Sequence, residues 1–171
     1  SSVAFHIVLD ECKVCAALVR SMVDDAYGRI DWTSEEVTKD HDFLPKFVRS
    51  VAADIRKASE ADPELPRIRL RTFINNVVDG FASSQEGIDQ LRKRSVMVQA
   101  AILACPIPAK VDQAVRSAYR DICAEAEEAD VPVAVRSSAA GEDSRKKAFA
   151  GLQDTFLNMV GEDAVATAYM W

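Results

Sequence analysis

This sequence lacks both a long apolar run and an excess of cations. No apolar segment approaches the roughly 20 residues that a membrane-spanning helix needs, so we expect no membrane partner. Lys and Arg total 21 against 27 Asp and Glu, which gives a net charge of −6. This balance argues against nucleic acid as a partner, because phosphate contacts need clustered cations. The hydrophobic share of 49% is that of an ordinary globular protein with a sizeable core.

Cysteine and histidine are also rare. The spacing of the four cysteines (Cys12, Cys15, Cys105 and Cys123) does not form a disulfide framework, so we expect free thiols in a reducing cytoplasm. His6 and His41 lack any motif around them and are interpreted as structural or surface residues, so no catalytic or metal residue is predicted.

The Cys12-x-x-Cys15 spacing leaves one redox alternative open. A thiol at a helix N-terminus has a lowered pKa and can be redox-active. The aromatic-Cys-Gly-Pro-Cys surroundings of known redox motifs are absent, and Lys13-Val14 fits a helical pattern. Two ordinary thiols are therefore the simpler interpretation, and a thiol-redox protein is the weaker alternative.

Apolar periodicity predicts a helix-rich chain. Helical spacing is expected over residues 16–26, about 47–58, 84–104 and 108–129, with Thr33 and Glu36 forming a capping box before a further helix. The alternation in Arg67–Phe73 favours a strand with a basic face, and Val133–Ser137 and Leu152–Met159 favour two more strands. A final helix is expected from Glu162. The fold class is therefore α/β in the broad sense, or α+β.

The polar loop between the last two predicted strands has the residue types of a phosphate site. Phosphate is bound by backbone N–H groups, hydroxyls and a fixed cation. Arg136 supplies a planar guanidinium, Ser137 and Ser138 supply hydroxyls, and Gly141 and Gly151 allow close backbone approach. A solvated hairpin with a surface arginine explains the same residue types.

The order of these residues adds a resemblance. "VPVAVRSSAAGED", then "FAGLQDTFLN", and before them "LRKRSVMVQAAILACPIPAKVDQAVRSAYRDI", are similar to the nucleotide-binding domain of the phosphoenolpyruvate synthase family. Relatives in that family include pyruvate phosphate dikinase, rifampicin phosphotransferase and phenylphosphate synthase. The resemblance covers about Ser84–Trp171.

The resemblance implies part of an ATP-grasp-like nucleotide-binding lobe with ATP and Mg²⁺ as cofactors. It also implies phosphoryl transfer from ATP through a histidine on another domain or chain. The positions that match the family's nucleotide-contacting stretches are Arg136, Ser137, Ser138, Gln153, Asp154 and Thr155.

The departures from the family pattern keep a second interpretation open. The family's Gly-Gly-Lys tripeptide and its phosphohistidine motif do not occur here. We therefore expect a partner subunit or further domains to carry the rest of the site. A non-catalytic interaction or regulatory subunit that keeps the lobe's fold is the alternative. The expected division is a helix-rich region of unknown role, residues 1–82, followed by the partial ATP-binding lobe, residues 83–171.

Overall fold

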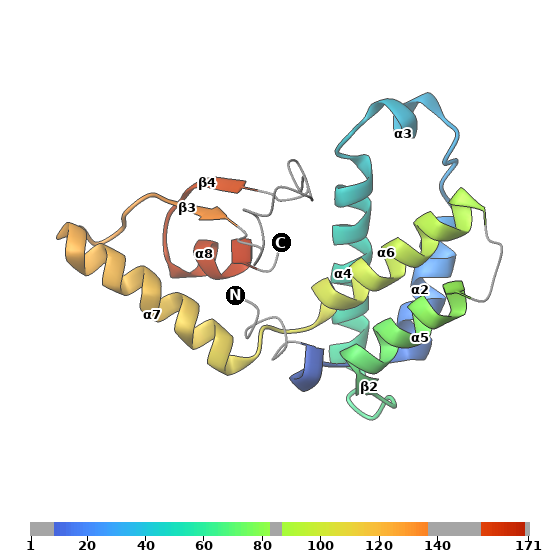
Figure 1. The fold of residues 1–171 in the computed structure, drawn as a ribbon, viewed down its shortest axis with the longest axis horizontal. Coiled ribbons are helices and arrows are strands. Elements are labelled where there is room, and N and C mark those ends of the chain that lie inside the picture. The colour runs from blue at the N-terminus through green and yellow to red at the C-terminus, as the bar shows by residue number, and fades with distance from the viewer. Residues whose placement is uncertain (1–8, 83–86, 137–154, 170–171) are drawn as a thin grey trace. The chain divides into compact units, whose positions relative to one another are not determined.

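The structure, a computed structural model, describes residues 9–82, 87–136 and 155–169, and these form two compact units (Figure 1). The helical unit comprises Leu9–Pro106, and the hairpin unit contains the described residues from Ile107 onward. The described residues are helix-rich, and their strands pair only antiparallel, in two sheets of two strands each. The observed class is therefore α+β, in agreement with the sequence. The predicted division at residues 82 and 83 falls between two helices of the helical unit and stays a prediction.

Among its described residues, the helical unit contains the helices α2 to α6 and one short antiparallel ladder. In chain order its elements are β1 (Lys13–Val14), α2 (Ala16–Gly28), α3 (Glu35–Lys39), α4 (Phe43–Ala61), β2 (Ile68–Arg69), α5 (Leu70–Ala82) and α6 (Ile88–Ala104).

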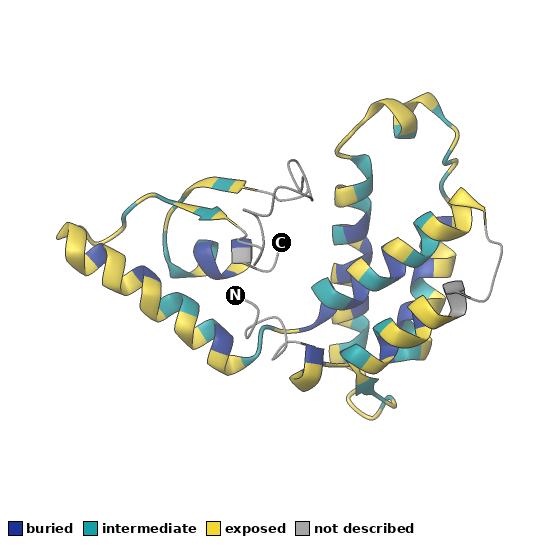
Figure 2. Cartoon of the chain, viewed as in Figure 1, coloured by how far each residue is buried: buried dark blue, intermediate teal, exposed yellow. Residues whose placement is uncertain are grey.

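The core of this unit lies between α2, α4, α5 and α6, and the dark blue positions in Figure 2 follow it. Its buried residues recur at helical spacing, as in Val48, Val51, Ala52 and Ile55 along α4. This spacing places them on one stripe of the helix. The side chain of Phe73 in α5 is completely buried. The predicted helix over residues 16–26 is confirmed as α2 and ends at Gly28, as expected.

The predicted basic strand over Arg67–Phe73 is wrong beyond its first residues. Only Ile68 and Arg69 pair with β1, and α5 begins at Leu70. Leu70, Phe73 and Val77 are buried at i, i+3 and i+7, the spacing of a helix face, and their burial outweighs the alternation of arginines. Consequently the arginines do not form one stripe.

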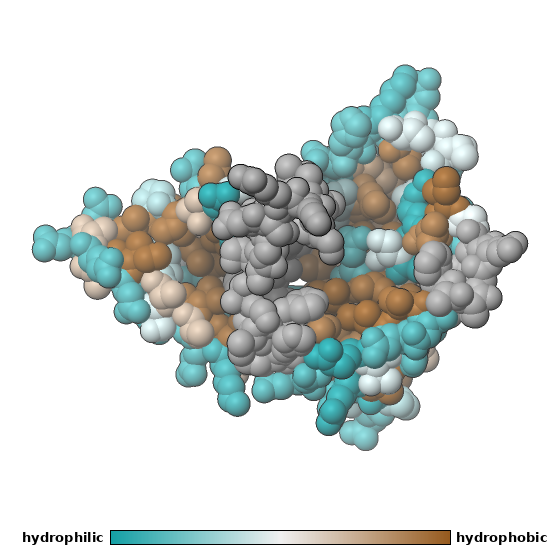
Figure 3. Space-filling model, in the orientation of Figure 1, coloured by the Kyte–Doolittle hydropathy of each residue, from teal (hydrophilic) through white to brown (hydrophobic). Residues whose placement is uncertain are grey.

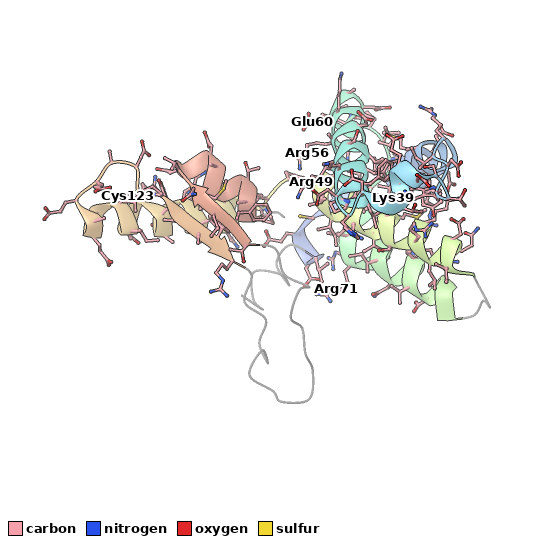
Figure 4. The ribbon with its side chains drawn as sticks, turned by 90° about the horizontal axis from the view of Figure 1, so that it is seen from above. Lys39, Arg49, Arg56, Glu60, Arg71 and Cys123 are labelled. Carbon is pink, nitrogen blue, oxygen red and sulfur yellow. The ribbon has the colours of Figure 1, made fainter. Side chains whose placement is uncertain are left out.

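Arg67 and Arg71 each bind a different set of neighbouring groups. The Arg67 guanidinium donates to the Ser59 and Pro63 carbonyls at 2.8 and 2.6 Å. Arg71 forms an ion pair with Asp10 at 2.6 Å and is visible in Figure 4. A continuous basic face for an anion or an acidic partner is therefore absent from this segment.

The capping prediction near residue 33 is displaced by one residue. Ser34, not Thr33, is the N-cap of α3, and its hydroxyl accepts from the Val37 amide at 3.4 Å. The Thr33 hydroxyl instead donates to the Asp31 carboxylate at 2.6 Å. Pro45 lies in the first turn of α4, where its missing N–H has no intrahelical partner to lose.

The hairpin unit contains α7 (Ala109–Ala126), β3 (Val133–Arg136), β4 (Thr155–Met159) and α8 (Glu162–Tyr169). Both predicted strands and both predicted helices are confirmed within the described residues. Glu127 adopts a left-handed conformation with φ of 56° and ends α7, three residues or so before the predicted end.

No single helix in the described ranges is long and apolar enough to cross a membrane. The consecutive helices α6 and α7 reach the necessary length and apolar content only when they are counted as one bent pair. Val96 and Ala100 of α6 are buried in the helical core. The face of the helical unit drawn in Figure 3 also carries apolar surface.

Candidate functional site

The β3–β4 hairpin brings two of the predicted site residues together. Arg136, the last residue of β3, is the direct partner of Thr155, the first residue of β4. Directly opposed residues of an antiparallel pair have Cβ atoms roughly 4.5–5.5 Å apart and point to the same face. The Arg136 and Thr155 side chains therefore leave the end of the hairpin on the same face.

The packing of the hairpin decides which face carries Arg136 and Thr155. Val133 and Val135 pack against a cluster formed by Tyr119 and Cys123 of α7 and Val165 of α8. Because side chains alternate along a strand, Arg136 lies on the opposite face, and both Arg136 and Thr155 are exposed. Exposed and partly buried positions alternate along β3, as the colours in Figure 2 show.

A bulge in β4 adjusts the register. Val133 pairs with Met159 and Val135 with Phe156, so β4 has one extra residue between these pairs. Asn158 at this point has φ of 55°, a left-handed conformation that Asn tolerates better than most residues. The extra residue lets both Val133 and Met159 contact the helix cluster while Arg136 and Thr155 remain opposed.

Tyr119 connects the open end of the hairpin to α7. Its hydroxyl donates to the Val131 carbonyl at 3.1 Å, just before β3, and accepts from the Gly161 amide at 2.9 Å, just after β4. The side chain is only 3% exposed. One residue therefore fixes both strands at the end away from Arg136. The sequence patterns gave Tyr119 no role of its own, although Tyr119 lies in the quoted stretch that carries the family resemblance.

An ion-pair group links α7 and α8 on the surface of the same unit. Arg116 contacts Asp112 at 2.9 Å and Asp163 at 2.6 Å, and Arg120 lies 3.6 Å from Glu162. These acids already pair with cations. Among the described cations of this unit, Lys110 and Arg136 lie outside this group, and Arg136 is the one at the hairpin end.

Four other predicted site residues lie outside the described residues: Ser137, Ser138, Gln153 and Asp154. Of the six predicted residues, only Arg136 and Thr155 can therefore be compared with what ATP and Mg²⁺ require. A guanidinium and a hydroxyl that leave the hairpin on the same exposed face fit the donor set that a phosphate group prefers. Within the described ranges no group of three His, Cys, Asp or Glu side chains could hold a metal ion, so these residues do not fit Mg²⁺.

The structure changes the pairing of the predicted thiol site. Lys13 and Val14 form a strand, so Cys12 and Cys15 do not share a helical turn. Cys12 instead lies beside Cys105, and all four cysteines are free and buried.

Comparison with known proteins gives one family. The family model described as "Pyruvate phosphate dikinase, AMP/ATP-binding domain" matches residues 4–171. The match therefore also includes residues 4–83, where the sequence motifs showed no resemblance.

Curated relatives carry a consistent name. The chain is 40% identical over 83 residues to the phosphoenolpyruvate synthases of Neisseria meningitidis and Escherichia coli, which is 48% of this chain and 10% of each relative. It is 32% identical over 99 residues to the phosphoenolpyruvate synthase of Aquifex aeolicus, 58% of this chain and 11% of that protein. The matched region thus spans about a tenth of these relatives. No solved structure matches the chain.

Proposed function

The chain belongs to the pyruvate phosphate dikinase AMP/ATP-binding domain family, and we propose that it is an ATP-binding part of a phosphoenolpyruvate-synthase-type phosphotransferase. The observation that carries the proposal is the opposition of Arg136 and Thr155 at the exposed end of the β3–β4 hairpin. Family membership indicates the ligand class, and this geometry supplies a suitable point of contact for its phosphates.

In this proposal Arg136 holds phosphate oxygens of ATP. A guanidinium keeps its charge at all physiological pH values and can donate two parallel hydrogen bonds to one phosphate. The Thr155 hydroxyl donates to the same phosphate group. Ser137, Ser138, Gln153 and Asp154 are proposed to complete this side of an ATP-grasp-like site, on the basis of the motif alone.

The remaining chemistry is proposed to come from elsewhere. Phosphoryl transfer needs several converging charges and Mg²⁺, whereas the described residues contain no metal-binding cluster. Mg²⁺ would offset the phosphate charge when it is bound with ATP. We propose that the phosphoryl group passes to a histidine on another domain or chain.

The fixed hairpin is central to this role. Tyr119 and the cluster around Val165 hold β3 and β4 at one end, so Arg136 and Thr155 are presented in a set register at the other. Such prior ordering lowers the conformational entropy lost on binding. A residue on an unanchored loop would be a weaker phosphate ligand.

Calorimetric titration with ATP and Mg²⁺ tests the proposal. We expect saturable binding that Arg136→Ala weakens by more than tenfold, because a charge-assisted hydrogen bond contributes about 1.5–3 kcal/mol. Arg120→Ala is the matched control, since it removes an equal charge from an exposed side chain of the same unit. Equal affinities for the two variants would refute the role of Arg136, and no binding by the unmodified chain would refute ATP binding by this chain.

A non-catalytic interaction subunit is the second candidate. An apolar groove of about 250 Å³ lies between α5 and α6, where Val77, Val78, Leu91 and Val98 line it. Val78 is 52% exposed. Exposed apolar surface of this kind favours a protein contact. The titration separates the two candidates, because the interaction subunit predicts no ATP binding.

A further inference from the structure

The two ends of the helical unit meet at a pair of cysteines. The unit begins at Leu9 and ends at Pro106, and Cys12 and Cys105 lie close to those two ends. The Cys12 thiol donates to the Pro106 carbonyl at 3.5 Å, although 94 positions separate the two residues. Cys105 contributes a side-chain hydrogen bond to Cys12. The fold therefore places two thiols in direct contact that are distant in sequence.

The backbone around Cys12 is held in position independently of the sulfur atoms. The Leu70 amide donates to the Cys12 carbonyl at 2.9 Å, and the adjoining β1 pairs with β2. On the other side, Cys105 follows the last turn of α6 and its amide donates to the Ile102 carbonyl. Both cysteines therefore belong to ordered segments, so their contact is a property of the packed unit.

The contact with Cys105 favours the thiolate form of Cys12. The hydrogen bond from the Cys105 thiol lowers the pKa of Cys12 from its ordinary value, and that same bond, together with burial, raises the pKa of Cys105. A donated hydrogen bond stabilises a thiolate, which is the nucleophilic form. Burial and the Glu11 carboxylate act against this effect at Cys12, but the hydrogen bond from Cys105 is the larger cause. The Arg56 guanidinium donates to the Leu103 and Ala104 carbonyls at 2.5 and 3.4 Å, and its charge favours the thiolate of Cys105.

We propose that Cys12 and Cys105 are a dithiol site that a hydroperoxide oxidises to a disulfide, which closes the helical unit at its two ends. The Cys12 thiolate attacks one peroxide oxygen, forms a sulfenic acid and releases hydroxide. The Cys105 sulfur then loses its proton and attacks the Cys12 sulfur, and the sulfenic oxygen leaves as water. With hydrogen peroxide, two thiols and one peroxide give one disulfide and two waters.

Neither of the other cysteines can replace this pair. Lys13 and Val14 are extended, and three extended residue steps span roughly 10 Å, which is longer than the roughly 4.4–6.8 Å that a disulfide needs between its Cα atoms. Cys123 belongs to the hairpin unit, where it packs with Tyr119 and Val165. The contact therefore predicts one specific linkage among the four thiols.

Peptide mapping after oxidation tests this linkage directly. The reduced chain is treated with stoichiometric hydrogen peroxide, the remaining thiols are alkylated, and the digest is analysed by mass spectrometry without reduction. We expect loss of two of the four free thiols and a peptide that joins Cys12 to Cys105. A Cys12–Cys15 linkage, sulfinic acid at Cys12 without linkage, or retention of all four thiols would overturn the proposal.

Variants and a melting curve sharpen the test. Cys12→Ser should abolish the linkage, whereas the matched controls Cys15→Ser and Cys123→Ser should keep it. Oxidation should raise the melting temperature of the unmodified chain, because a crosslink between the two ends restricts the unfolded state, and dithiothreitol should reverse the rise. An oxidised chain that melts at or below the temperature of the reduced chain would refute the closing role. The mapping of the unmodified chain does not depend on whether a variant folds.

Discussion

The helical unit and the hairpin unit hold their residues in place by different means. The eight largest fully buried side chains of the described residues, including Phe73, Leu70 and Val19, all belong to the helical unit. The hairpin unit has a thin core around Tyr119, Cys123 and Val165, supplemented by hydrogen bonds and ion pairs. Its candidate phosphate ligand, Arg136, lies on the exposed face. Apolar burial thus dominates one unit, whereas directional polar contacts set the geometry of the unit proposed to bind ATP.

The largest expected effect concerns the helical core. Phe73→Ala should lower the free energy of unfolding by about 3–5 kcal/mol, because it removes a completely buried ring and leaves a cavity. Urea denaturation followed by circular dichroism measures this loss. Ile122→Ala on α7 is the control, since Ile122 is 44% exposed and its truncation should change little. A loss below 1 kcal/mol for Phe73→Ala would contradict the importance of this core.

Tyr119→Phe tests the polar contacts of the hairpin unit. The variant keeps the ring but removes the hydroxyl that donates to the Val131 carbonyl and accepts from the Gly161 amide. We expect a loss of about 1–3 kcal/mol, since buried backbone groups lose their partner. Amide hydrogen exchange should show faster exchange at Gly161. Unchanged protection there would mean that the hairpin does not depend on Tyr119.

The sequence patterns predicted the two strands of the hairpin unit but not the contacts that set their register. Alternating apolar residues in Val133–Arg136 and Thr155–Met159 are a local signal, and both strands were predicted. The bulge near Asn158, which opposes Arg136 to Thr155, depends on packing against α7 and α8 and could not be read from a local pattern.

The helical unit shows where local patterns mislead. The arginine alternation in Arg67–Phe73 has the period of a strand, yet burial of Leu70 and Phe73 against the other helices makes most of it helical. The contact of Cys12 with Cys105 was equally hidden, because it joins segments at opposite ends of the unit. Cys12-x-x-Cys15, the nearby pair in sequence, suggested the wrong neighbour for Cys12.

A pH titration examines a polar contact inside the helical unit. Burial, followed by the hydrogen bond to Asp89 at 2.8 Å, raises the pKa of Tyr27 to about 12. A raised pKa in the folded state means that the unfolded state loses its proton first as pH rises. Stability from this contact should therefore be complete below pH 10 and decline as pH rises toward 12.

The Tyr27→Phe variant measures how the stability contribution of Tyr27 declines with pH. The difference in free energy of unfolding between the unmodified chain and Tyr27→Phe should shrink as pH increases from 10 to 12. Tyrosinate absorbance of the folded chain should lose its highest-pKa component in the variant. A constant difference over this range would show that Tyr27 titrates normally.

The smallest expected effect lies on the surface of the hairpin unit. Arg116 joins Asp112 of α7 to Asp163 of α8, but the Asp163 side chain is 93% exposed. Exposed ion pairs contribute about 0.2–1 kcal/mol and are screened by salt. A double-mutant cycle of Arg116→Ala and Asp163→Ala should therefore give a coupling below about 1 kcal/mol that decreases at high salt. A larger, salt-independent coupling would mean that α7 and α8 depend on this contact, and that the hairpin unit is held mainly by charge and not by the Tyr119 cluster.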